Sequence, residues 1–412
     1  MCLTVKRDRA ALICAARLFE KNGEKLFAVG GFVRNRLMGL FAVDIDVCSS
    51  VPPERVIAIC GGHMGARLVN RRLGTVELTL GGVTMEHTTF RRESYGRGRD
   101  PVSVELGVTM DEDAMRRDFA MNAVYEDPLS GELFDPTGKG LGDIAARRLS
   151  TTADDPDIIM RDDGLRLMRL CRFAGELGAK AELSLIESAK RNAPLIDDVS
   201  RERIWAELSR SLLSDMTYGM TEGYLESERL LILTGVLARI LPGAGMFRAD
   251  IESAPDIDVR LAALLFENGA EKTAEALSML RAPSERIKNV RTMLLAHELL
   301  TGGAAVEQAA ALTGKKLFKK LDLLESALCF AGEANRAYDT DSFAGRDGVP
   351  YTVRDLDISG DDIASLGASG RQIGDCLNKL LLETMVVPAE NARKKLLYRA
   401  KVILGVDNSP QR

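Results

Sequence analysis

Short apolar runs, separated by glycine and charged residues, occupy the first third of the chain and predict strands. Val43, Ile45 and Val47 alternate with two aspartates, which is the period of a strand with one buried face. A Gly-Gly pair at 81–82 separates two further runs, as is typical of a β-hairpin. The predicted elements are strands at Leu26–Val29, Val43–Val47, Thr75–Leu80 and Gly82–Phe90, and a helical segment around Asp113–Val124.

Beyond about Ala153 the apolar residues follow helical spacing, and prolines and glycines interrupt them. We find no internal repeat and no low-complexity tract. The pattern therefore predicts an α/β head followed by a long all-helical body. Its clearest helical segments are Arg161–Leu177, Ser200–Leu213, Ser227–Ile240 and Asp258–Glu267.

Composition narrows the classes of protein that this pattern could represent. A chain of 412 residues is too long for one ordinary domain, and a hydrophobic fraction of 46% supports real cores. The net charge of -5 means that any nucleic acid would be bound through local basic patches. The seven cysteines are scattered, which indicates reduced thiols and a cytoplasmic protein. No apolar stretch is long enough to cross a membrane, so no membrane partner is expected.

The most informative segment holds Asp44 and Asp46, which a strand would place on one face. Two carboxylates that close repel each other unless a cation lies between them, so the pair predicts a divalent-metal site. Gly30 and Gly31 precede the pair and could let backbone N–H groups approach phosphates, and Arg34 would supply a fixed positive charge. Glu86 is a possible third carboxylate. The alternatives are an edge strand with solvated acids and a tight strand–helix turn.

Polar residues within the apolar stretch Met115–Val124 suggest a second group of contacts. Arg117 could pair with a phosphate, and Asp118 or Asn122 could bind a ribose hydroxyl. A structural salt bridge between arginine and aspartate is an equally good explanation of this segment.

Arginines recur every third residue within Arg161–Gly178, at Arg166, Arg169 and Arg172. Asp163 and Arg166 would lie one helical turn apart and could face the same plane. An aspartate accepts from the exocyclic amino group of cytosine or adenine, and an arginine donates to a ring nitrogen or carbonyl. The pair therefore predicts selection of C and A over G and U, whereas a helix-capping salt bridge is the alternative.

In this order, the segments closely resemble the class II tRNA nucleotidyltransferases (CCA-adding enzymes), which share a head with bacterial poly(A) polymerases. The resemblance covers nearly the whole chain and implies an α+β fold. A small mixed-sheet head of the polymerase-β-like palm type would be followed by an all-helical neck, body and tail. The matching stretches are GGFVRNRLMG…DID, TTFRRE, RRDFAMNA, DPLSGELFDPTGKGLGD, DDGLRLMRLCRFA, SRERIWAEL and LDISGDDIASLGASGRQIGDCLNKLLLE.

The resemblance also implies roles for individual residues and for the parts of the chain. The implied domains are a nucleotidyltransferase head at 1–150, a neck for nucleotide selection at 151–215, a body at 216–300 and a tRNA-binding tail at 301–412. Four lysines, Lys315, Lys316, Lys319 and Lys320, are candidates to hold tRNA phosphates, with a solvated helix end as the alternative. The implied roles are Mg²⁺ ligands for Asp44 and Asp46, triphosphate contacts for Gly31, Arg34 and Arg117, an amino-acid template for CTP and ATP in Asp163 and Arg166, and support of the nucleotide by Arg169 and Arg172.

The activity implied is addition of C, C and A to the 3′ end of tRNA from CTP and ATP, with release of pyrophosphate. The terminal ribose hydroxyl would attack the α-phosphate with assistance from Mg²⁺. The alternatives are addition of CC alone or A alone, a poly(A) polymerase and a non-catalytic RNA-binding relative. The tail match and the absence of a strongly basic C-terminus argue against the poly(A) polymerase, and the retained Asp44–Asp46 pair argues against the non-catalytic relative.

Several positions depart from the family pattern. Asn35 stands where the family usually has aspartate, Asp162 replaces a glutamate, and Gly164 replaces a better helix former. In the loop Arg91–Pro101, Arg97 stands at an aspartate position and Asp100 at an arginine position. Because that loop helps the pocket of the family switch from C to A addition, the final product is expected to depend on it.

Overall fold

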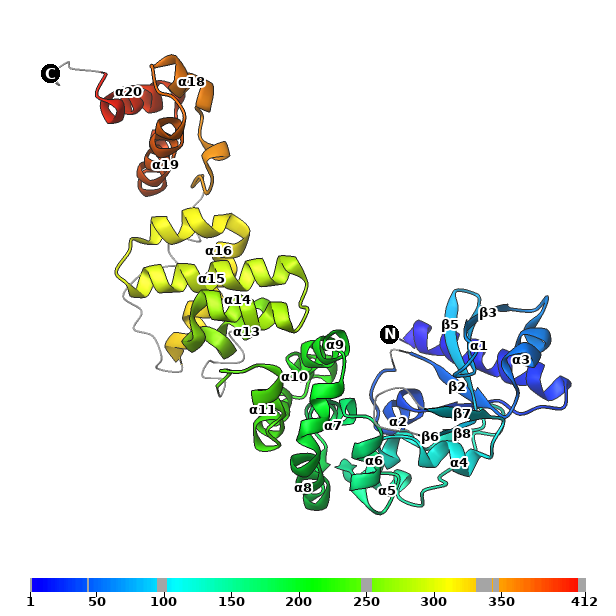
Figure 1. Ribbon diagram of the computed structural model, residues 1–412. Helices are drawn as coiled ribbons and strands as arrows, with labels where there is room; N and C mark the ends of the chain where they lie inside the picture. Colours follow the sequence, from blue (N-terminus) through cyan, green and yellow to red (C-terminus); the bar gives the residue numbers. More distant parts are fainter. Residues whose placement is uncertain are drawn as a thin grey trace. The chain divides into compact units, whose positions relative to one another are not determined.

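The computed structural model describes residues 2–42, 44–94, 102–245, 254–330, 343 and 348–406 of the chain. These residues form two compact units, 1–242 and 243–412. The first unit combines a sheet with helices, and the described residues of the second are helical (Figure 1). The expected α+β class is therefore confirmed. The boundaries of the four expected domains remain a prediction. The two units divide the chain between residues 242 and 243, so the expected boundary at 215/216 lies within the first unit.

Among the described residues, seven strands form one mixed sheet in the order β3-β4-β5-β2-β1-β8-β9. The β2–β5 pair is parallel, and the other neighbours in this sheet are antiparallel. Helices α1 (Cys2–Lys21) and α3 (Pro53–Cys60) pack against its strands. The strands are β1 Phe27–Val29, β2 Asp46–Ser49, β3 Gly65–Asn70, β4 Thr75–Leu80, β5 Val83–Thr89, β8 Tyr125–Glu126 and β9 Leu133–Phe134.

The predicted hairpin is confirmed. Leu80 pairs with Val83, and both residues of the connecting turn, Gly81 and Gly82, have positive φ (57° and 77°). A two-residue turn with this backbone matches the right-handed twist of the flanking strands. A smaller hairpin follows, with β6 (Arg91–Ser94) antiparallel to β7 (Ser103–Leu106). Residues 95–101 of the loop Arg91–Pro101, including Arg97 and Asp100, lie outside the described residues.

The single helix expected around Asp113–Val124 is wrong, because α4 (Met110–Met115) ends well before Val124. Phe119 is extended (φ -120°, ψ 143°) and forms a bridge with Thr151. The Asp118 carboxylate accepts from the Phe119 N–H at 2.8 Å, a local bond that competes with helix formation. A short 3₁₀ turn at Ala120–Asn122 follows.

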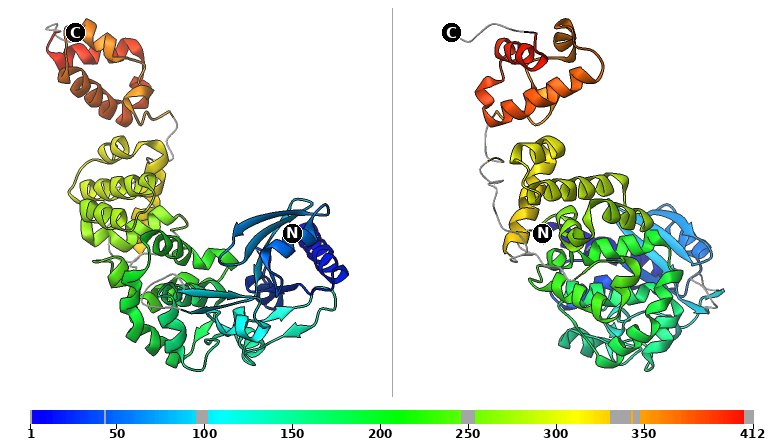
Figure 2. Two further views of the ribbon diagram at one scale, coloured as in Figure 1. Left: turned by 45° about the vertical axis from the view of Figure 1, so that its right-hand side comes forward. Right: turned by 60° about the vertical axis from the view of Figure 1, so that its left-hand side comes forward.

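Helices continue the first unit after the sheet, and Figure 2 shows them in green beside the blue and cyan strands. The buried helix α7 (Leu165–Leu177) is central, since α9, α10 and α11 all pack against it. The others are α2 Gly31–Leu37, α5 Gly140–Ala146, α6 Pro156–Asp162, α8 Leu183–Asn192, α9 Arg201–Ser211, α10 Ser214–Tyr218, α11 Gly223–Leu233 and α12 Val236–Ile240.

The second unit has a helical core in which α15 and α16 pack against α13. Its buried side chains include Leu261, Leu294 and Leu321. In the described part of the chain, no helix is long and apolar enough to span a membrane. The helices are α13 Ile257–Leu265, α14 Gly269–Met279, α15 Ser284–Thr301, α16 Val306–Phe330, α18 Gly360–Ser365, α19 Arg371–Val386 and α20 Arg393–Leu404.

Candidate active site

Carboxylates gather where β2 and β5 run side by side. The parallel register pairs Asp46, the first residue of β2, with Glu86, and both residues line a cavity of about 300 Å³. Asp44 is exposed and precedes the strand, so the prediction that Asp44 and Asp46 share one strand is wrong. Gly30 (φ 71°) lies close to Asp46, since a Cβ on this glycine would lie 3.1 Å from Oδ2 of Asp46.

The carboxylates at this end of the site suit a divalent cation. Burial raises the pKa of Asp46, and the neighbouring carboxylates of Glu86 and Asp44 raise it further, against the opposing effect of Arg117. Such a concentration of carboxylates is relieved by a cation that prefers oxygen ligands. In the described part of the chain, no three His, Cys, Asp or Glu side chains form a ready-made metal site. A cation held by one or two carboxylates and completed by substrate phosphates and water fits this donor set.

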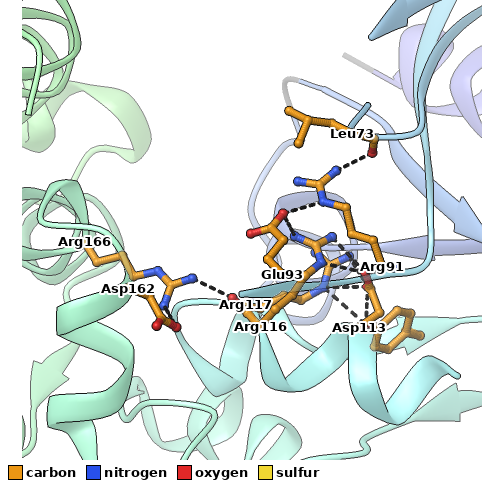
Figure 3. Close-up of polar contacts among 9 residues, drawn as sticks. Leu73, Arg91, Glu93, Asp113, Arg116, Arg117, Asp162 and Arg166 are labelled. Atoms are coloured by element: carbon orange, nitrogen blue, oxygen red, sulfur yellow. Dashed lines mark hydrogen bonds and ion pairs between the residues drawn. The ribbon is translucent and has the colours of Figure 1, made fainter. Parts of the chain in front are cut away.

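Three arginines border the carboxylates and continue into a second cavity. Arg91, Arg116 and Arg117 line the first cavity and also line a neighbouring one of about 290 Å³. Asp113 holds two of them, at 2.8 Å from Arg116 and 2.9 Å from Arg117 (Figure 3). The two cavities together form a cleft that is acidic at one end and has a wall of guanidinium groups beyond it.

Residues that were expected to select the base line the second cavity. Asp163, Arg166 and Arg169 all contribute to its wall. Asp163 does not lie on one helix with Arg166, because α6 ends at Asp162 and α7 begins at Leu165. The prediction of one helix over Arg161–Leu177, with Asp163 and Arg166 one helical turn apart on it, is therefore wrong.

The break lies at Asp163, whose backbone is extended (φ -148°, ψ 111°), and Gly164 follows it in a helical conformation. A Cβ on Gly164 would lie 2.5 Å from the main-chain oxygen of Leu195, so only glycine fits where the chain passes that carbonyl. This contact explains why a poor helix former stands at that position.

Arg166 is 6% exposed and is held by three acceptors. Its guanidinium donates to the main-chain oxygens of Ile159 (2.8 Å) and Arg116 (2.6 Å), and to the carboxylate of Asp162 (3.3 Å). Figure 3 shows Arg166 reaching toward the segment that carries the other arginines. The side chain therefore has a fixed orientation at the boundary between α6, α7 and the head.

Asp163 pairs with Arg203 on α9 at 2.6 Å, and its other oxygen accepts from the Leu165 N–H at 3.0 Å. The salt bridge between Asp163 and Arg166 that was the alternative explanation of this pair does not form, because Arg166 pairs with Asp162. Asp163 is thus fixed both by Arg203 and by the first residue of α7.

The ring of Phe173 on α7 is surrounded by guanidinium groups. Arg172 lies 4.1 Å, Arg34 4.9 Å and Arg169 5.0 Å from its centroid. Burial lowers the pKa of Arg34 to about 10, so this side chain is still a cation at neutral pH. Its partners are Asn122 and Asn35, the second of which also donates to Tyr218 and to the Phe41 carbonyl.

All three predicted arginines on α7 have acidic partners, and that of Arg166 is Asp162. Arg169 pairs with Asp118 at 2.6 Å, and Arg172 pairs with Glu176 and Glu207 inside the unit. Burial alone would raise the pKa of Asp118, but Arg169 and Asn122 hold it well below its usual value. Asp118 thus forms a salt bridge with an arginine, which was one of the two explanations of its segment, although this arginine comes from α7.

The cleft brings together only part of the predicted set. Asp46, Arg117, Asp163, Arg166 and Arg169 line it, whereas Asp44, Gly31, Arg34 and Arg172 line neither cavity. Gly31 is the first residue of α2 and directly follows Gly30, the glycine that approaches Asp46. The roles expected of the four residues outside the cavities remain predictions.

Sequence reasoning missed Arg91 and Arg203, which also line the cleft. A signal existed for both, because each lies in a stretch that carries the family resemblance, TTFRRE and SRERIWAEL.

Comparisons with known proteins agree with this arrangement. Residues 26–150 match the family model of the poly(A) polymerase head domain. The chain is 31% identical over 311 residues to the CCA-adding enzyme of Geobacillus thermodenitrificans, an alignment that covers 73% of this chain and 72% of the relative. It is 29% identical over 360 residues to the CCA-adding enzyme of Bacillus velezensis, covering 84% and 85% of the two chains.

Solved structures share the fold. The crystal structure of the Bacillus stearothermophilus CCA-adding enzyme in complex with CTP matches with a TM-score of 0.77 and 22% identity, over 96% of this chain and 97% of that one. A CCA-adding enzyme in complex with ATP matches with a TM-score of 0.70 and 16% identity, over 99% and 96% of the chains.

Proposed function

The chain belongs to the family of CCA-adding enzymes, and on this premise we propose that it adds C, C and A to the 3′ end of tRNA from CTP and ATP. The observation that carries the proposal is the pair of adjoining cavities, which share Arg91, Arg116 and Arg117. Carboxylates stand at one end, where phosphoryl chemistry needs a cation, and polar groups suited to a base edge stand at the other. A nucleoside triphosphate fits this order, with its phosphates and their cation at the acidic end and its base at the other.

In the reaction, the terminal ribose hydroxyl of tRNA attacks the α-phosphorus, and the bond to the β-phosphate breaks, which releases pyrophosphate. Arg117 lies at the wall that the two cavities share and binds the triphosphate. Its positive charge stabilises the negative charge that develops on the leaving pyrophosphate. Gly31 and Arg34 support the same phosphates from α2 in this proposal. Gly31 directly follows Gly30, which approaches Asp46, and Arg34 interacts electrostatically with Asp46. Both positions are consistent with that role.

We propose Mg²⁺ as the cation, with Asp44 and Asp46 as its protein ligands and Glu86 as a candidate third carboxylate. When bound, such an ion activates the attacking hydroxyl and offsets charge on the leaving group. The support is the acidic end of the cleft, where the carboxylates of Asp46, Glu86 and Asp44 interact electrostatically.

Selection of the base is assigned to Asp163 and Arg166, with Arg169 and Arg172 behind them. Cytosine and adenine both carry an amino group beside an acceptor, which suits a carboxylate next to a guanidinium. The partners of Arg166 and Asp163 hold both groups in one orientation, which a protein template requires.

The four-part division of the chain is also part of the proposal. Residues 151–215, which carry α6 to α9, would form the selecting neck, and the lysines of α16 would hold tRNA phosphates. A cytoplasmic location is supported by the free cysteines of the described residues.

One experiment tests the product. We would incubate the protein with tRNA lacking its last three, two or one nucleotides, supplying each of the four nucleoside triphosphates singly. CMP should join the first two substrates and AMP the third. Failure with the third substrate indicates addition of CC alone, and activity only with the third indicates addition of A alone. ATP-dependent extension of an unrelated RNA indicates a poly(A) polymerase.

A non-catalytic relative is distinguished by Asp44→Ala. The variant should lose nucleotide incorporation but keep its affinity for tRNA, because the change removes a cation ligand and no RNA contact. Asp375→Ala, at an exposed position on α19, serves as the control and should retain incorporation. Incorporation that persists in Asp44→Ala would mean that the metal assignment is wrong.

A further inference from the structure

A buried tyrosine lies against the arginine to which we assign triphosphate binding. Tyr125 is fully buried, and its hydroxyl donates to Oδ2 of Asp113 at 2.8 Å and accepts from Nε of Arg117 at 3.2 Å. Nη2 of Arg117 donates to the same Oδ2 at 2.9 Å. The three groups close a ring of hydrogen bonds around one carboxylate oxygen, with the guanidinium 5.3 Å from the tyrosine ring. Figure 3 shows Asp113 together with Arg116 and Arg117.

The two groups that hold the guanidinium come from ordered elements. Asp113 lies on α4, which begins with a capping box between Thr109 and Glu112. Tyr125 begins β8, where it pairs with Val29 and packs edge-on against Phe90 at 6.0 Å. Arg117 itself follows the end of α4 and belongs to no helix or strand. Its orientation therefore depends on contacts from its neighbours.

The arrangement leaves part of the arginine facing the cleft. Among the residues that the structure describes, Nη1 of Arg117 has no hydrogen-bond partner, although Nε and Nη2 are both engaged. Arg117 lines both cavities. Burial alone would raise the pKa of Asp113, but Arg117 and Arg116 hold it well below its usual value, so the carboxylate stays charged.

A long, flexible arginine loses rotamer freedom when it binds an anion, and this loss weakens binding unless the side chain is already fixed. We propose that Tyr125 and Asp113 are positioning residues, which hold Arg117 in the orientation that receives the phosphates of CTP or ATP. The inference rests on the proposed function. It adds to that function a set of contacts, from Tyr125 and Asp113, that fixes the phosphate end of the site and does not involve the residues at the base end.

The test is Tyr125→Phe, which removes only the hydroxyl and keeps the ring against Phe90 and Arg117. Two quantities are measured: the affinity for inorganic tripolyphosphate, which carries no base, and the KM and kcat for CTP and ATP. Loss of a hydrogen bond to a charged group should weaken tripolyphosphate binding and raise both KM values by the same factor, about three- to tenfold. The preference for CTP and ATP over GTP and UTP should stay unchanged.

Controls separate positioning from a general loss of stability. Tyr224→Phe removes the hydroxyl of another buried tyrosine, on α11 outside both cavities, and should leave tripolyphosphate affinity unchanged. Asp113→Asn keeps the shape of the carboxylate but removes its charge, and it should weaken tripolyphosphate binding at least as much as Tyr125→Phe.

Unchanged tripolyphosphate affinity in Tyr125→Phe, with only a lower melting temperature, would overturn the proposal and leave the ring of bonds a purely structural one. An equal loss of affinity in Tyr224→Phe would also overturn it. Absence of CMP and AMP incorporation by the unchanged protein would instead refute the proposed function, because tripolyphosphate binding is measured without any reaction.

Discussion

Arg166 receives its orientation from three acceptors, two of which are main-chain oxygens on different segments. A lysine has one ammonium group and cannot present a planar fork to all of them. We therefore expect Arg166→Lys to reduce discrimination against GTP and UTP by about tenfold or more, because a bidentate base contact contributes about 1–3 kcal/mol. The KM for CTP should change less. Ratios of kcat/KM for the four nucleotides measure the effect.

Arg161→Lys provides the matched control. Arg161 lies on α6, five residues before Arg166, but its side chain is 66% exposed and pairs only with Asp157 among the described residues. Nucleotide selection should not change in this variant. Unchanged selection in Arg166→Lys as well would remove Arg166 from the template.

The second prediction concerns His87 and the dependence of stability on pH. This residue is fully buried on β5 beside Ser49, and burial lowers its pKa to about 3. The unfolded chain binds a proton near pH 6.5, whereas the folded one does not, so stability falls as the pH drops below about 6.5. When the pH falls from 7 to 5, this histidine should lower the free energy of unfolding by about 2 kcal/mol.

His87→Phe should remove that part of the pH dependence, as measured by denaturant unfolding at the two pH values. Phe19 packs against the ring, so an aromatic replacement suits the site. The exposed His63 serves as the control, and His63→Gln should keep the pH dependence of the unchanged protein. A difference between pH 7 and pH 5 that survives in His87→Phe would show that other groups cause it.

At this scale the sequence identified residues whose chemistry is evident within one short segment. Asp46 is an example, since it stands between the apolar residues Ile45 and Val47, and it lines the cleft. Arg203 was missed because its partner Asp163 lies 40 residues earlier and only the packing of α9 against α7 brings them together. The buried pairing of Arg172 with Glu207 was hidden for the same reason, because the two residues are 35 positions apart.

At the scale of elements, local chemistry again separates what could be predicted from what could not. The hairpin at Gly81 and Gly82 was predictable, because its turn needs only those two residues and alternating flanks. The break between α6 and α7 lies at Asp163, which is extended and pairs with Arg203, 40 residues later in the chain. Periodicity alone therefore joined the two helices into one.

The close contact at this break leads to a prediction for Gly164→Ala. The added Cβ would lie 2.5 Å from the Leu195 oxygen, so either α7 or the 3₁₀ segment Ala193–Asp198 must move. Overpacking of this kind costs about 1–3 kcal/mol of the free energy of unfolding. The shift should also displace Asp163 and lower kcat/KM for CTP. Thermal unfolding and steady-state kinetics measure the two effects.

Gly142→Ala is the control, because this glycine lies within α5 and a Cβ there meets nothing within 4 Å. Alanine in such a helical position is expected to be neutral or to stabilise by up to about 1 kcal/mol. If both variants unfold at the same temperature, the contact with Leu195 does not constrain the chain.

At the scale of the whole chain, the proposed catalytic groups and the proposed tRNA lysines belong to different units. The cleft lies within residues 1–242, whereas the lysines follow Gly314, where α16 is interrupted by a residue with φ 68°. Positive charges at the start of a helical segment are unfavourable for that helix, since its dipole is positive there. The same position attracts phosphate, so an RNA ligand would offset the cost.

This arrangement predicts that Lys315→Gln, Lys316→Gln and Lys319→Gln combined will weaken tRNA binding and leave the KM for CTP unchanged on a short RNA substrate. Each lost phosphate contact should reduce the slope of log affinity against log salt by about 0.7–0.9, measured by titration at several salt concentrations. Lys320 is left intact because it pairs with Asp256 and Asp258. The exposed Lys272 on α14 supplies the control, and Lys272→Gln should keep the slope. An unchanged salt slope in the triple variant would assign the tRNA phosphates to other residues.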